Sequence, residues 1–123
     1  MTKHKDAAID FLKMVVARKI TEAYAKHVSP KMIHHNAHFP HDAQSLMNGM
    51  IEAHTKFPNT VLHIKHAVEE GDVVAVHSHV VMQKGDTGVA VVHLFRFSGD
   101  KIVEMWDIGQ QVPKESPNKA GMF

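Results

Sequence analysis

Cysteine is absent from the 123-residue chain. Its absence excludes disulfides, thiol nucleophiles and thiolate metal sites, and it fits a reducing compartment such as the cytoplasm. No apolar run approaches the roughly 18 residues that are needed to cross a bilayer. The N-terminal residues also lack the apolar core of a signal peptide. We therefore expect a cytoplasmic protein with no membrane partner.

Charge of one sign is also scarce. The chain has 14 Lys and Arg against 13 Asp and Glu, which gives a formal net charge of +1. Nucleic-acid-binding domains carry a basic patch that this even balance does not supply. A Gly-rich phosphate loop and the Gly-x-Ser-x-Gly turn of serine hydrolases are missing as well. We expect no nucleic-acid partner, and the sequence contains no motif for a phosphate-binding loop or a serine hydrolase.

Histidine, in contrast, is abundant, with 12 copies. Imidazole changes its charge between about pH 5 and pH 8, so histidines that share one face of a sheet can form a functional site. The placement of each histidine on a helix or a strand therefore matters for function.

The hydrophobic period changes halfway along the chain. Helical spacing predicts helices over residues 5–18, 20–26 and 43–56, with Tyr24 and His54 on inner faces and Asp42 as an N-cap. Alternation predicts strands over 61–69, 73–83, 89–97 and 101–109, after a short extended stretch at 32–37. Helices followed by antiparallel strands predict one α+β domain over residues 1–123, with a curved sheet that three N-terminal helices cover. Such a sheet can enclose a ligand cavity.

Strand parity then sorts the side chains. Assumed loops of five residues at 84–88 and three residues at 98–100 would place four titratable side chains on one face. They are His77, His79, His93 and Asp107. The same loops would set His93 opposite Met105. In a partly dry pocket a carboxylate has a raised pKa and becomes a usable acid or base.

The same histidines allow a second interpretation. His77, His79 and His93 could hold a metal ion, with Asp107 as a fourth ligand. This alternative stays open at the level of the sequence.

Several segments carry a family resemblance. Residues 92–96 read Val-His-Leu-Phe-Arg, and residues 99–107 read Gly-Asp-Lys-Ile-Val-Glu-Met-Trp-Asp. Together with Met-Ile-His-His-Asn at 32–36 and the Met-Phe close at 122–123, they resemble the SnoaL-like polyketide cyclases of the nuclear-transport-factor-2-like superfamily. The resemblance implies a cone-shaped, cystatin-like barrel, usually a homodimer, with one deep pocket per subunit. It also implies aldol ring closure without metal or cofactor, in which an aspartate acts as acid and base; relatives isomerise or dehydrate other compounds.

Position by position, the resemblance implies roles for particular residues. His35 and Asn36 match the family's His-Asn pair, and Asp107 matches the aspartate of its Trp-Asp pair. His93 and Met105 depart from the pattern, because they replace an aspartate and a histidine.

Our leading hypothesis is acid/base proton transfer on a small apolar carbonyl compound by Asp107, His35 and His93. We expect six further residues to line the substrate pocket: Asn36, His77, His79, Phe95, Met105 and Tyr24. The alternative is a binding module of the same fold without turnover. The outer sheet face, where Trp106 and Ile108 point, is the expected homodimer surface.

Overall fold

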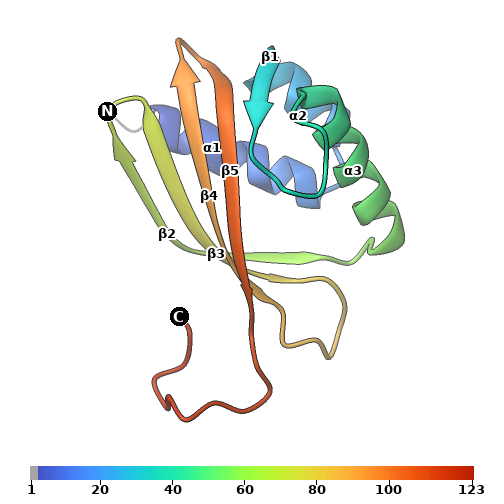
Figure 1. Cartoon of the computed structure of the whole chain (residues 1–123), viewed down its shortest axis with the longest axis vertical. Helices are drawn as coiled ribbons and strands as arrows, with labels where there is room; N and C mark the ends of the chain where they lie inside the picture. Colours follow the sequence, from blue (N-terminus) through green and yellow to red (C-terminus); the bar gives the residue numbers. More distant parts are fainter. Residues whose placement is uncertain (1–2) are drawn as a thin grey trace.

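The computed structural model describes residues 3–123 (Figure 1). The helices are α1 (Lys3–Val16), α2 (Ile20–His27) and α3 (Ala43–Lys56). The strands are β1 (Val28–His34), β2 (Val61–Glu70), β3 (Val73–Val81), β4 (Val89–Ser98) and β5 (Lys101–Gln111). The α+β class is confirmed. The extended stretch predicted at 32–37 is instead β1, which starts directly after α2. None of the helices within residues 3–123 is long and apolar enough to cross a membrane.

The five strands form one sheet in the order β1-β5-β4-β3-β2. All neighbours are antiparallel except β1, which runs parallel to β5. Pro30 lies in β1, where an edge strand tolerates a residue that cannot donate a backbone hydrogen bond. At the other edge, β2 bulges between Ile64 and His66.

The helices cover the inner face of the sheet, with α1 on β2 and β3 and with α2 and α3 near β1 (Figure 1). Phe11 of α1 is the centre of the core. Its ring meets the edges of Tyr24 and Phe95 at centroid distances of 5.5 and 5.7 Å. Asp42 caps α3 as predicted, because its carboxylate accepts from the backbone N–H of Ser45 at 2.9 Å.

The β4–β5 hairpin is one residue tighter than the sequence analysis assumed. Ser98 pairs with Lys101, so the turn contains only Gly99 and Asp100, and Gly99 has a φ of 60°. Glycine adopts this left-handed conformation without steric cost. A bulge beside Arg96 and Phe97 then shifts the register again. His93 therefore faces Asp107, and the predicted pairing of His93 with Met105 is wrong.

The β3–β4 connection corrects a second prediction. Val80 pairs with Val89, so the connection is longer than the five residues assumed, and His93 pairs with Val76. His77 and His79 pair with Val92 and Ala90, on the opposite face from His93. A shift of one residue moves a strand's side chains to the other side of the sheet. The shared face predicted for His77, His79 and His93 is therefore wrong.

Helix α1 ends in a left-handed residue that is not glycine. Arg18 has a φ of 64°. Its N–H donates to the carbonyl of Val15 at 3.0 Å, and the N–H of Lys19 donates to that of Met14 at 2.9 Å. These two bonds form a Schellman cap, in which glycine is the favoured residue.

We expect Arg18→Gly to raise the free energy of unfolding by about 1 kcal/mol, because glycine removes the Cβ strain of the left-handed conformation. Urea unfolding measures the change. Arg18→Ala is the matched control, since it removes the same guanidinium but keeps a Cβ. An equal gain in both variants would place the effect in the side chain rather than in the backbone.

Candidate functional site

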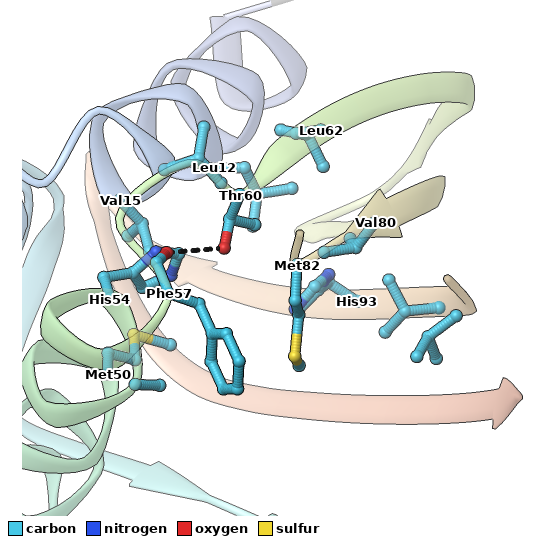
Figure 2. Close-up of a pocket in the computed structure, with 14 residues that line it drawn as sticks. Leu12, Val15, Met50, His54, Phe57, Thr60, Leu62, Val80, Met82 and His93 are labelled. Carbon is cyan, nitrogen blue, oxygen red and sulfur yellow. Dashed lines mark hydrogen bonds between the residues drawn. The ribbon is translucent and has the colours of Figure 1, made fainter. Parts of the chain in front are cut away.

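A cavity of about 230 Å³ lies between α1, α3 and the strands β2, β3 and β4 (Figure 2). Its walls are mainly aliphatic, aromatic and thioether side chains, among them Leu12, Val15, Met50, Phe57 and Met82. Only three of its 14 lining residues have a polar side chain.

These polar residues are His54 of α3, His93 of β4 and Thr60. The hydroxyl of Thr60 already donates to the carbonyl of Phe57 at 2.9 Å (Figure 2). The two imidazoles are therefore the polar side chains that the cavity offers to a ligand. They come from opposite walls, one from a helix and one from the sheet (Figure 2).

His93 is a partly buried wall residue with an unusual ring nitrogen. Its Nδ1 is buried and has no hydrogen-bond partner among the described residues. Burial lowers the pKa of His93 below its ordinary value, and the charge of Asp107 on the neighbouring strand partly opposes this shift. The imidazole is consequently neutral at pH 7.

Asp107 lies beside His93 but is not part of the cavity wall. The side-chain N–H₂ of Asn36 donates to both of its carboxylate oxygens, at 3.2 and 3.0 Å. Asn36 is fixed in turn, because its backbone N–H donates to Nδ1 of His34 at 3.0 Å and its Oδ1 accepts from the N–H of His38 at 2.9 Å. The loop after β1 thus orients the carboxylate.

Tyr24 connects this carboxylate to the cavity. Burial, and next the charge of Asp107, raise the pKa of Tyr24 above its usual range. The Tyr24 hydroxyl donates to the sulfur of Met50 at 3.4 Å, and Met50 lines the cavity. Asp107 is therefore close to the cavity, beside His93 and near Tyr24.

His35, predicted as catalytic, lies elsewhere. Its Nε2 pairs with the carboxylate of Glu104 at 2.6 Å, and its ring stacks on Trp106 at a centroid distance of 5.0 Å. Strand alternation is the cause, since His34 is buried and points inward while His35 is exposed. The structure therefore does not bring His35 to the cavity with His93.

His77 and His79 lie on the outer face of the sheet. Nδ1 of His77 is 3.0 Å from Nδ1 of His66, and Nε2 of His79 donates to the carbonyl of Thr87 at 2.8 Å. Phe123 stacks on His79 at a centroid distance of 4.5 Å. The alternative interpretation of His77, His79 and His93 as a metal site is wrong, because the sheet separates His93 from the other two. No group of three or more metal-ligating side chains converges within residues 3–123.

Phe95 and Met105, predicted as pocket residues, pair with each other inside the core and are 0 % and 1 % exposed. Tyr24 and Asn36, also predicted there, contact Met50 and Asp107 instead of lining the cavity. His54, which does line the cavity, was not predicted as a site residue. The signal in the sequence was that His54 is a titratable residue on the apolar stripe of the helix predicted at 43–56.

Comparisons with known proteins agree on family and fold. The sequence profile described as SnoaL-like polyketide cyclase matches residues 6–116. No protein of the curated set matches the chain. A SnoaL-like protein of unknown function from Burkholderia thailandensis has a similar structure, with a TM-score of 0.76 and 12% identity over 89% of this chain and 97% of that one.

Two further structures are similar. AclR from Streptomyces galilaeus, a putative hydroxylase, has a TM-score of 0.73 and 22% identity over 90% of this chain and 81% of its own. A putative polyketide cyclase from Acidithiobacillus ferrooxidans has a TM-score of 0.71 and 18% identity over 88% of each chain. Identities this low establish the common fold alone.

The two partly buried imidazoles of the cavity make stability depend on pH. His93 and His54 both have a lowered pKa in the folded state, so the unfolded chain binds protons more readily. We expect the free energy of unfolding to fall as pH drops below the ordinary histidine value of 6.5, by up to about 1.4 kcal/mol per pH unit for His93. Urea unfolding at pH 7, 6 and 5 measures it.

His93→Phe should weaken this pH dependence, whereas His38→Asn, which changes an exposed histidine, should keep it. The same slope in all three proteins would show that His93 does not contribute.

Proposed function

Because the chain belongs to the SnoaL-like polyketide cyclase family, we propose that it is a cofactor-free enzyme that moves a proton beside the carbonyl of a small apolar compound. One observation carries the proposal: a neutral imidazole, His93, reaches an apolar cavity directly beside Asp107, whose carboxylate Asn36 holds in place. Carboxylate and imidazole are the groups that such a reaction requires.

Asp107 is the proposed base. Its carboxylate takes a proton from the carbon next to the carbonyl, and the electron pair of that C–H bond moves onto the carbonyl oxygen as an enolate. Aldol ring closure, isomerisation and dehydration share this first step. The proton then returns from Asp107 to the product, so the enzyme is unchanged at the end of the cycle. Met50, which lines the cavity and accepts from Tyr24, has an unbranched thioether side chain that can move to make room for the substrate.

His93 supplies the stabilising hydrogen bond. Its buried Nδ1 has no acceptor nearby, so a hydrogen on that atom would be an unsatisfied buried donor. The favoured tautomer carries the hydrogen on Nε2, which can donate to the enolate oxygen as the negative charge develops. His93 replaces the aspartate of the family pattern at this position. The site therefore has a neutral hydrogen-bond donor here instead of a second carboxylate.

Asn36 is the proposed positioning residue. It donates to both oxygens of Asp107, which fixes the direction in which the carboxylate points. The role in substrate binding predicted for Asn36 thereby becomes a role through Asp107.

Exchange of carbon-bound hydrogen in D₂O tests the chemistry with a simple probe ketone. We expect the protein to accelerate deuterium incorporation into the methyl group of acetophenone. Asp107→Asn should lower this rate by about 10²- to 10⁴-fold, the usual contribution of a general base. ¹H NMR of the methyl signal measures the rate.

Asp100→Asn is the control, because Asp100 lies in the exposed β4–β5 turn. An Asp107→Asn protein that is folded and retains the full exchange rate would remove Asp107 from the mechanism.

A ligand-binding module without turnover is the second candidate. The favouring observation is that Asp107 does not line the cavity and that Asn36 already occupies both of its oxygens. Tight binding of acetophenone with no acceleration of exchange would select this function over the enzyme.

We also propose that two copies pair through the outer face of the sheet. Large apolar side chains are exposed there, notably Val68 at 64% and Ile108 at 61%. Exposed apolar clusters of this kind mark association surfaces.

Ile108→Glu should convert a dimer into a monomer, because it places a charge where apolar surfaces would meet. Light scattering after size exclusion measures the mass. Ile51→Glu changes an exposed isoleucine of α3 instead and should leave the mass unchanged. A native protein that is already monomeric at micromolar concentration would contradict the pairing.

A further inference from the structure

His54 presents the second free imidazole to the cavity, from α3. Its Nδ1 is buried and has no partner among the described residues, whereas its Nε2 is neither buried nor hydrogen-bonded. Burial, and next the charge of Arg18, lower the pKa of His54, so this ring too is neutral at pH 7.

The two imidazoles therefore have the same chemical character. In each ring a hydrogen on Nδ1 would be a buried donor without an acceptor, so the favoured tautomer carries it on Nε2. Both Nε2 atoms are then hydrogen-bond donors without an acceptor in the described part of the chain, residues 3–123. A ligand satisfies them if it brings an acceptor oxygen to each.

The rest of the cavity limits the body of the ligand. No lining residue is Asp, Glu, Lys or Arg, so a charged ligand would lose its hydration without gaining a counter-charge. The volume of about 230 Å³ is below the roughly 300–1,000 Å³ of pockets that take drug-sized ligands. The body is thus small, apolar and uncharged.

We propose that the cavity binds an uncharged compound with two carbonyl-type acceptors on a small apolar body, one acceptor on His93 and the other on His54. The inference rests on the proposed function only in placing the ligand in this cavity. It makes His54 a specificity-determining residue, and it limits the substrate to a dicarbonyl or a similar compound of one or two rings.

Three probes on one benzene ring separate the features. 1,4-Diacetylbenzene has two carbonyl acceptors, acetophenone has one, and 4-acetylbenzoate replaces the second by a charged carboxylate. Isothermal titration of the full chain measures the Kd of each. We expect 1,4-diacetylbenzene to bind about five- to tenfold more tightly than acetophenone, the value of one added hydrogen bond. 4-Acetylbenzoate should bind most weakly.

Variants assign the second acceptor. His54→Phe should abolish the preference for 1,4-diacetylbenzene and leave the Kd of acetophenone within about twofold, since His93 still binds one carbonyl. His54→Gln restores a side-chain donor and should recover part of the preference; it also tests His54 if the Phe variant does not fold. His63→Phe, the same substitution on the outer face, should change neither Kd.

Equal affinity of the native protein for 1,4-diacetylbenzene and acetophenone would overturn the inference. So would a preference that survives in His54→Phe, or tightest binding of 4-acetylbenzoate. The proposed chemistry can fail independently of this inference. Failure of the chemistry would appear as no acceleration of deuterium exchange, whereas the two-acceptor preference is measured by binding alone.

Discussion

The pairing of His93 with Asp107 across β4 and β5 is the contact on which the rest of the site depends. It places a neutral imidazole against the cavity and an ionisable carboxylate directly behind it. Three features fix the pairing: the two-residue turn at Gly99 and Asp100, the bulge beside Arg96 and Phe97, and the core packing of Phe95 against Phe11. A slip of one residue would turn His93 to the outer face and bury Leu94 in its place.

This dependence explains what the sequence could predict. The helices and strands follow from hydrophobic period, which is a local property, and their existence is confirmed almost to the residue in α3. The shared face of His93 and Asp107 was also predicted, although the assumed loop was one residue too long. The bulge, which sequence alternation does not reveal, compensated for that error. Between β3 and β4 no bulge compensated for the wrong loop length, so His77 and His79 were predicted on the wrong face.

The cavity itself could not be derived from strands alone. One of its two imidazoles, His54, projects from α3, and its position depends on how that helix packs against β1 and α2. Residues that looked like pocket residues by parity, Phe95 and Met105, are core because the helices fill the space above them. Strand alternation predicts on which face of the sheet a side chain lies. Helix packing decides which positions on that face remain open to the cavity.

The sheet has two edge strands, β1 and β2, and each carries a feature that resists pairing with another chain. Pro30 interrupts the donors of β1, and the bulge at Ile64 and His66 distorts the longer β2 and sets Lys65 out of step. Natural sheets use proline, lysine and bulges at their edges because a regular, unpaired strand is a template for aggregation. Apolar side chains such as Ile108 can therefore be exposed on the outer face without the edges also joining into fibrils.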